Sequence, residues 1–395
     1  MTDCDVPQPE FEGTPAIFAG MLLAVGTVMV FSASMTARPS DTEQIFLSRH
    51  LLFVAIGLSA ATVSALLPHH WWPRLAPLLF LGTIAGLVLV LMPGFGKTVN
   101  GAQRWLRVGP LTIQPSEMAK VTLPLMLAVV RCWFAKRQGS RLLELVLHGL
   151  LMAVTLGLIL IQPDLGTTLF IGMACVLLLF VSGWPIIDFV IAGGLAIPAA
   201  TMLLALKPYQ LARIRGFLDA WQRPEQAPYQ IQQSLTTLGV GGWHGTGLGQ
   251  GNQKLSFLPE ANTDFIFAVV GEELGLIGTL GIVGLWAGFY YVCAKRIRQL
   301  PEKSFASMVS QTLLLQLVLQ AAINIAVVLA LVPPKGIPHP FLSYGGSSLV
   351  TSCLMVGMIL GLTRLPATNN GDTLHSDSNS AHSSHDMPLP DALPA

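Results

Sequence analysis

The chain has 395 residues, of which 52% are hydrophobic and 11% are charged, and its mean hydropathy is +0.61. So few charges cannot cover the surface of two or three soluble domains, and the composition indicates an integral membrane protein. The formal net charge of +1 leaves no basic excess for nucleic acid, which excludes a soluble nucleic-acid binder. The five cysteines show no C-x-x-C spacing, so neither a structural zinc site nor a disulfide framework is expected.

Ten stretches of about 20 mostly apolar residues, the length of a membrane-spanning helix, follow one another along the chain. Two boundaries are weak, because only 162–164 and 183–185 interrupt a long apolar stretch, and nine spans remain the alternative. The sequence predicts an all-α polytopic membrane protein of about ten transmembrane helices, with a large extracytoplasmic loop between helices 7 and 8. The predicted spans are 15–35, 48–67, 74–93, 115–134, 142–161, 164–182, 184–206, 264–294, 306–332 and 346–363.

The basic residues orient these spans. Four Lys or Arg residues cluster in each of the loops 131–141 and 295–303, which the positive-inside rule places in the cytoplasm. The loop 207–263 then lies outside, and both termini lie in the cytoplasm. We expect a short N-terminal segment (1–14) without the basic flank of a cleaved signal peptide, a transmembrane domain (15–364), and a disordered polar tail (365–395).

Charges inside membrane spans are costly, so the few that occur are candidates for function. Glu117 and Lys120 lie three residues apart on one helix face, where they form either a neutralising ion pair or part of a substrate site. Asp164 follows a proline at a predicted helix start, where capping is the default role. One of Glu272 and Glu273 is expected to face the bundle interior and the other a neighbouring helix; the sequence does not distinguish them.

The loop 207–263 is the longest polar segment between spans, and loops of this length are usually functional. Arg213 and Arg215 near its start could pair with phosphate. The glycines of 239–249 permit close backbone approach, which suits a ligand-clasping loop or a tight surface loop equally well. At the end of the loop, Asp264 marks the return into the membrane, either as a first-turn carboxylate of the next helix or as a general base.

Seven blocks of motif residues resemble the SEDS family (shape, elongation, division and sporulation), polytopic proteins that polymerise cell-wall glycan. The blocks occur in the family's order and fit its ten-helix layout. Gly247, Leu248 and Gly249 and the pair Lys335–Gly336 resemble the division branch, with the elongation branch as the alternative. The blocks are 100–105, 114–120, 162–166, 229–234, 258–268, 271–275 and 340–348.

The resemblance implies a peptidoglycan glycosyltransferase that polymerises lipid II, a disaccharide-pentapeptide on undecaprenyl pyrophosphate. A sugar hydroxyl attacks the anomeric carbon of the growing chain, and Asp264 is the family's counterpart of the base that activates it. The departing pyrophosphate needs positive charge from basic residues or from Mg²⁺ or Mn²⁺; no cofactor is certain. The expected substrate-binding residues are Arg104, Glu117, Lys120, Arg213, Arg215, Gln233, Ser234, Glu260, Thr263, Ser343, Tyr344 and Ser347.

The resemblance also implies partners and a location. We expect a class B penicillin-binding protein, the transpeptidase that crosslinks the glycan, together with other membrane proteins of the division machinery and no nucleic acid. The expected location is the bacterial inner membrane at the division septum. A lipid II flippase is the rival from another functional class, but a flippase needs access from both faces, whereas the motif blocks cluster on the external side.

Overall fold

The structure is a computed structural model. The N-terminal segment, the tail beyond Arg364, and the candidate residues Arg213 and Arg215 lie outside the described residues. The structure describes residues 13–34, 41–99, 102–109, 111–137, 139–205, 216–217, 221, 227–251, 260–333 and 336–364.

Ten apolar helices of the described chain coincide with the ten predicted spans. Seven of them are long and apolar enough to cross a membrane, α6 and α12 have 17 residues each, and α7 has 20. The predicted fold class is therefore confirmed. The chain forms separate helices on either side of both weak boundaries, so the described residues contain ten apolar helices and not nine. The helices are α1 (Thr14–Ser34), α2 (Asp41–Leu66), α3 (Trp72–Leu91), α4 (Pro115–Arg137), α5 (Arg141–Ile161), α6 (Leu165–Val181), α7 (Ile186–Ala205), α10 (Ile266–Ile297), α11 (Phe305–Val328) and α12 (Gly346–Leu362).

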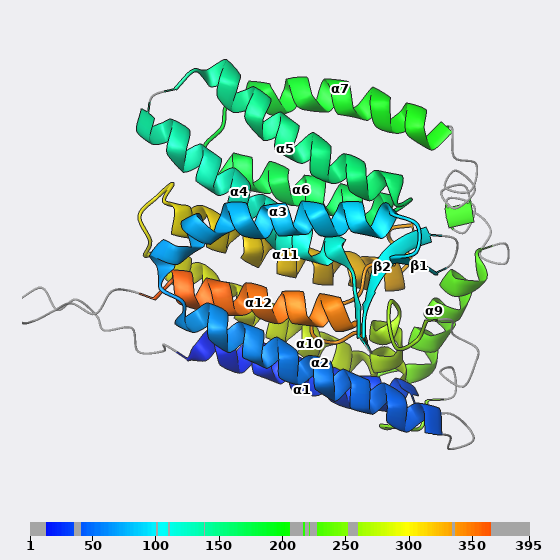
Figure 1. Cartoon of the computed structure of the whole chain (residues 1–395). Helices are drawn as coiled ribbons and strands as arrows, with labels where there is room; N and C mark the ends of the chain where they lie inside the picture. The colour runs from blue at the N-terminus through cyan, green and yellow to red at the C-terminus, as the bar shows by residue number, and fades with distance from the viewer. Residues whose placement is uncertain are drawn as a thin grey trace, which may run out of the picture. The chain divides into compact units, whose positions relative to one another are not determined.

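The helices divide into buried and peripheral ones. In the most apolar window of α4 and of α10, 61% of the residues are buried, and 56% in α11, against 17% in α2 and in α5. Figure 1 shows α4 and α11 between a flank formed by α1 and α2 and an opposite flank that includes α5 and α7. Helix α12 packs along α2, where Gly357 leaves room for the backbone of Ala61. Polar groups on α4, α10 and α11 are therefore enclosed by protein.

A small sheet and a short helix lie outside the spans at one end of the bundle. An antiparallel sheet of β1 (Gly96–Val99), β2 (Ala102–Val108) and β3 (Leu111–Ile113) connects α3 to α4, where the sequence predicted only an external loop. Helix α9 (Tyr229–Gly241) lies within the long loop between α7 and α10. Both lie at the end of the bundle where α4 and α10 begin and where α11 ends (Figure 1).

Helix α10 is broken ten residues after its start. Gly275 has φ 67° and ψ −164°, a non-helical conformation inside the helix. The backbone of the glycine-rich segment 242–247 fills the break: the amides of Thr246 and Gly247 donate to the carbonyls of Glu272 (2.9 Å) and Glu273 (3.1 Å).

The second half of α10 is joined to the same segment. The amides of Leu276 and Ile277 donate to the carbonyls of Gly242 (2.9 Å) and Trp243 (3.3 Å). Unpaired backbone groups cost several kcal/mol away from water, so an interruption of a membrane helix persists only where protein supplies partners. The glycines of this loop allow its backbone to insert into α10. The sequence had suggested only a ligand-clasping loop or a tight surface loop.

The break at Gly275 yields a stability prediction. An alanine there would hold a positive φ, and its Cβ would collide with the backbone of Gly245 and Trp243. We expect Gly275→Ala to lower the free energy of unfolding by about 2 to 5 kcal/mol, from backbone strain and overpacking together. Thermal unfolding of the purified protein in detergent measures this loss.

Gly281→Ala is the matched control, because Gly281 lies in the same helix with no atom within 4 Å of an added Cβ. Alanine in a helix interior is more favourable than glycine by about 0.5 to 1 kcal/mol, so Gly281→Ala should keep or raise the melting temperature. Equal effects of the two substitutions would show that the spliced break does not stabilise the fold.

The orientation of the bundle is a further prediction from the basic loops. Cysteines placed at the exposed His244, next to α9, and at the exposed Gln299, after α10, lie toward opposite ends of the bundle. In a cysteine-free background, a membrane-impermeant maleimide should label the His244 position in intact cells and the Gln299 position only after permeabilisation. The reverse pattern would overturn the orientation and the external placement of Asp264.

Candidate functional site

Asp264 lies in the turn that leads into α10, and its main chain is held from two sides. The Asn324 side-chain amide of α11 donates to the Asp264 carbonyl at 2.7 Å. The Ser343 hydroxyl donates at 2.6 Å to the carbonyl of the preceding residue, Thr263. Every residue from Ile266 to Glu273 is buried, so the half-helix that follows is enclosed by protein. The carboxylate therefore extends from a fixed backbone.

The segment 336–345, between α11 and α12, forms the wall beside Asp264. An added Cβ on Gly336 would lie 3.0 Å from the Asp264 Oδ2 atom, so only a glycine fits there without crowding the carboxylate. The amide of Tyr344 donates to the carbonyl of Asn262 at 2.8 Å, and the amide of His339 donates to the Ser343 hydroxyl at 2.7 Å. Ser343 and Tyr344, both predicted site residues, thus shape the segment around Asp264.

Three amide side chains on one face of α11 connect this wall to the bundle interior. Gln316, Gln320 and Asn324 are spaced four residues apart, and all three are buried. Gln320 donates to the Pro338 carbonyl at 2.8 Å, and Asn324 also donates to the Ile337 carbonyl at 2.9 Å. This stripe was not predicted from the sequence, although amides at i, i+4 and i+8 in an apolar span lie on one helix face.

The stripe continues to the predicted pair on α4. Lys120 Nζ lies 2.7 Å and 2.8 Å from the two carboxylate oxygens of Glu117 and 3.2 Å from the Gln320 amide oxygen. Gln316 donates to the Lys120 carbonyl at 3.1 Å. Both charged side chains are almost fully buried, at 4% and 6% exposure. The two charges neutralise each other. Among the described contacts, Gln320 links Lys120 to the segment 336–345 beside Asp264.

Arg104, on β2, contacts the turn between α5 and α6. Its guanidinium donates to the carbonyls of Gln162 (3.2 Å) and Pro163 and lies 3.6 Å from the Asp164 carboxylate. Asp164 also caps α6, because its carboxylate accepts the Thr167 amide at 3.2 Å. The Arg104 side chain is 32% exposed, so it is the most accessible of the described basic candidates.

The remaining predicted residues have mainly structural contacts. Ser347 accepts the Gln114 amide at 3.1 Å and joins α12 to the sheet. On α9, the buried Ser234 donates to the Val328 carbonyl at 2.8 Å, while Gln233 is half-buried. The exposed Glu260 accepts the Thr263 hydroxyl at 2.8 Å. These contacts join α9 to the end of α11 and the start of α12 to the end of the sheet.

Two neutral side chains lie in the wall segment. Burial raises the pKa of the Tyr344 hydroxyl, opposed by the charge of Arg49, and burial lowers the pKa of His339 to about 4. The His339 ring is stacked on Phe267 of α10, with ring centroids 6.2 Å apart. Both side chains are uncharged near pH 7, so they add no charge next to Asp264.

Glu273 of α10 pairs with the neighbouring helix α1, as expected of one of the two adjacent glutamates. The Ser32 hydroxyl donates to both carboxylate oxygens of Glu273, at 2.7 Å and 2.6 Å. The Gly249 amide donates to the same carboxylate at 3.1 Å. Glu273 therefore anchors the inserted glycine-rich segment as well as α1.

Comparison with known proteins agrees with this architecture. The family model described as cell cycle protein, the FtsW/RodA/SpoVE model, matches residues 14–366. This chain belongs to the FtsW/RodA/SpoVE family. Two relatives carry the name probable peptidoglycan glycosyltransferase FtsW. The protein from Geobacter sp. (strain M18) is 40% identical over 88% of this chain and 95% of its own, and that from Coxiella burnetii is 39% identical over 86% and 92%.

Solved structures of the family share the fold. One, described as a peptidoglycan synthase complex that coordinates polymerization and crosslinking, matches with a TM-score of 0.71 and 28% identity over 89% of this chain and 96% of the other. The Thermus thermophilus rod shape determining protein RodA matches with a TM-score of 0.65 and 27% identity over 89% and 96%. The resemblance of the motif blocks to the SEDS family is thereby confirmed.

The buried pair of this FtsW/RodA/SpoVE family member yields a prediction. Removal of one partner leaves an uncompensated buried charge and typically costs about 3 to 5 kcal/mol, more than replacement of both by apolar residues. We expect Lys120→Met to lower the folded yield and melting temperature more than the double substitution Glu117→Leu with Lys120→Met. Wild-type behaviour of the single and the double variants would exclude a structural role of the pair.

Proposed function

We propose that this chain is a peptidoglycan glycosyltransferase that polymerises lipid II into glycan strands during cell division. One observation carries the proposal: the carboxylate Asp264 extends from a backbone fixed by Asn324 and Ser343, and a glycine, Gly336, lies beside its Oδ2. It lies at the end of the bundle where the long loop, α9 and the sheet meet. The names of the family relatives supply the substrate class.

In the proposed reaction, Asp264 is the general base. The 4-hydroxyl of the incoming sugar loses its proton to the carboxylate and attacks the anomeric carbon of the growing chain, while the lipid pyrophosphate leaves. A hydroxyl is a weak nucleophile, so the base must approach within about 3 Å of it. A fixed backbone maintains that distance without reorganisation at each turnover.

We assign the charge that compensates the pyrophosphate to Arg104 rather than to Lys120. Lys120 is 4% exposed and bonded to Glu117. The guanidinium of Arg104 also contacts two carbonyls and Asp164, but it is 32% exposed at the same end of the bundle as Asp264. Arg213 and Arg215 remain candidates from the sequence. No step depends on Mg²⁺ or Mn²⁺; within the described ranges, no three His, Cys, Asp or Glu side chains converge as a metal site.

A division role is favoured over elongation by the names of the relatives, all FtsW among those compared at 39–40% identity. We further propose that the chain acts in the inner membrane at the septum with a class B penicillin-binding protein. The solved synthase complex supports this, because its description joins polymerization to crosslinking. A flippase is disfavoured, since the polar side chains that extend from the segment beside Asp264 into the bundle, Gln320 and Lys120, are buried and bonded to protein groups.

The test of the proposal is lipid II polymerisation by purified variants, with and without a class B penicillin-binding protein. Asp264→Asn removes basicity but keeps the main-chain carbonyl that Asn324 holds. We expect a folded protein with polymerisation reduced by about 10² to 10⁴-fold, the usual loss for a general base. Near-normal polymerisation by folded Asp264→Asn would return Asp264 to the role of a helix-start carboxylate.

A steric variant tests the same geometry without a change of the carboxylate. Gly336→Ala places a methyl group 3.0 Å from the Asp264 Oδ2, and a displacement of about 1 Å at a reacting group can cost about 100-fold in rate. Gly345→Ala is the matched control, because its Cβ would lie at 3.6 Å from the Ser348 Cβ, an ordinary contact. Equal activity of the two variants would contradict a base at Asp264.

A further inference from the structure

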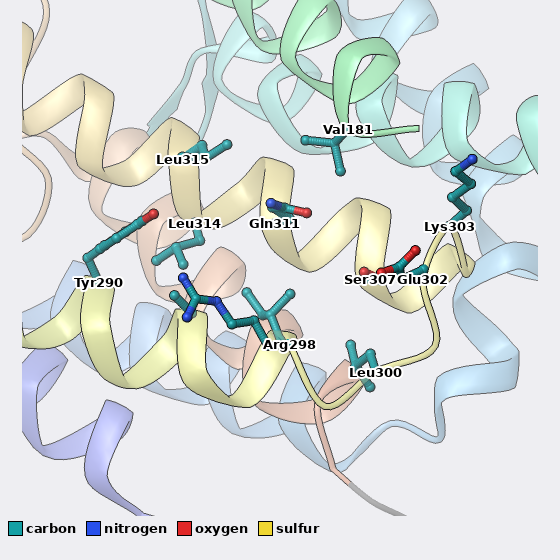
Figure 2. Close-up of a pocket in the computed structure, with 12 residues that line it drawn as sticks. Val181, Tyr290, Arg298, Leu300, Glu302, Lys303, Ser307, Gln311, Leu314 and Leu315 are labelled. Carbon is teal, nitrogen blue, oxygen red and sulfur yellow. The ribbon is translucent and has the colours of Figure 1, made fainter. Parts of the chain in front are cut away.

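A cavity lies at the opposite end of the bundle from Asp264, between the end of α10 and the start of α11. Its volume is about 340 Å³, within the range of about 300–1,000 Å³ typical of ligand sites. Figure 2 shows Tyr290 and Arg298 on one side, Gln311 on α11, and Val181 at the end of α6. No residue assigned to glycosyl transfer lines this cavity.

One part of the cavity is apolar and the other is basic. The apolar part consists of Val181, Ala294, Ile297, Leu300, Leu314 and Leu315. Arg298, Lys303 and Glu302 supply two positive charges and one negative charge at its rim. In the described part of the chain, no hydrogen bond or ion pair engages the side chains of these three residues. The rim therefore has a net positive charge that the protein leaves unneutralised.

Gln311 and Tyr290 add hydrogen-bonding groups at membrane depth. Gln311 lies about 9 Å along α11 from its first residue, at about 1.5 Å per residue. Both side chains are exposed, and in the described residues neither has a side-chain hydrogen bond. A polar group that faces hydrocarbon is costly unless it finds a partner, so a ligand with polar atoms at this depth would satisfy both.

The position of the cavity selects the kind of ligand. It lies at the end of the bundle with the basic loops 131–141 and 295–303. A soluble anion would match the arginine and the lysine but leave the apolar part unfilled. A lipid with an anionic headgroup matches both parts, because basic pockets between membrane helices on the cytoplasmic side bind such headgroups.

We propose that this cavity binds an anionic phospholipid, with its phosphate at the rim that Arg298 and Lys303 flank from opposite sides (Figure 2) and its upper acyl chain against Leu314 and Leu315. Gln311 and Tyr290 then donate hydrogen bonds to the glycerol ester region. Glu302 disfavours a second negative charge and limits the site to one phosphate. The site is independent of the proposed glycosyl transfer.

The experiment titrates lipid into the full-length protein in detergent and counts bound lipids by native mass spectrometry. Phosphatidylglycerol and phosphatidylethanolamine with identical acyl chains are compared, with inorganic phosphate as a soluble competitor. We expect phosphatidylglycerol to bind at least about tenfold more tightly, since each basic residue near a lipid surface contributes about fivefold in affinity. Equal affinities, or displacement by millimolar inorganic phosphate, would overturn the proposal.

Variants locate the binding. Arg298→Gln with Lys303→Gln should weaken phosphatidylglycerol binding on the order of 20-fold and leave phosphatidylethanolamine nearly unchanged. The matched control, Lys136→Gln with Lys295→Gln, removes the same charge from the same end of the bundle outside the cavity. The control should change the affinity for phosphatidylglycerol by less than about twofold. A loss equal to that of the cavity variant would show that general surface charge, and not the cavity, binds the lipid.

A third variant should raise the affinity for phosphatidylglycerol, so it tests the proposal even if the double variant Arg298→Gln with Lys303→Gln does not fold. Glu302→Gln removes the only carboxylate among the described residues that line the cavity, so it should tighten phosphatidylglycerol binding by about fivefold. Unchanged or weaker binding would place the phosphate elsewhere. Because lipid binding is read without polymerisation, this outcome and the outcome of the Asp264→Asn assay are distinguishable.

Discussion

The break in α10 depends on one constraint, that a backbone group within a membrane must find its hydrogen-bond partner in the protein. At Gly275 the helix loses its own continuity, and the segment 242–247 restores the pairing on both sides of the break. The side chain of Glu273, before the break, accepts the amide of Gly249, two residues after that segment, and the hydroxyl of Ser32 in α1. The short half-helix in front of the break is thus fixed in place, and Asp264 is fixed at its start.

A second polar path reaches the same end of the bundle through α11. The amides of Gln320 and Asn324 donate to carbonyls of the irregular segment 336–345 and of Asp264, and the amide of Gln316 donates to the Lys120 carbonyl. The amide nitrogens of all three side chains are paired, and such bonds specify one arrangement. The buried amide oxygens of Gln316 and Asn324 have no hydrogen-bond partner within the described residues. The Glu117–Lys120 pair belongs to this network, because Lys120 Nζ lies 3.2 Å from the Gln320 amide oxygen. The buried pairs therefore support the site, whereas the two candidate reactive residues, Asp264 and Arg104, are partly exposed.

The sequence predicted the spans well because about 20 apolar residues are a strong signal that needs no tertiary information. It also predicted the Glu117–Lys120 pair and the cap at Asp164, which depend on spacing along one helix. It did not predict the sheet at 96–113, whose pairing joins short segments with mixed polarity, nor the insertion of 242–247 into α10. The strands are neighbours in the chain but too short to give a clear alternation, whereas the insertion depends on contacts between segments about 30 residues apart. The amide stripe on α11 could have been predicted from its spacing, but only charged residues within the spans were taken as candidates for function.

The spliced break also constrains how homologous chains can vary in length. Four backbone bonds pair residue 242 with 276, 243 with 277, 246 with 272 and 247 with 273. A residue inserted or deleted between these positions in either segment would break that register. Elsewhere in the loop between α7 and α10 no such register joins the chain to a span in the described residues. Insertions in this family should therefore accumulate before α9 and avoid the eight or so residues that follow it.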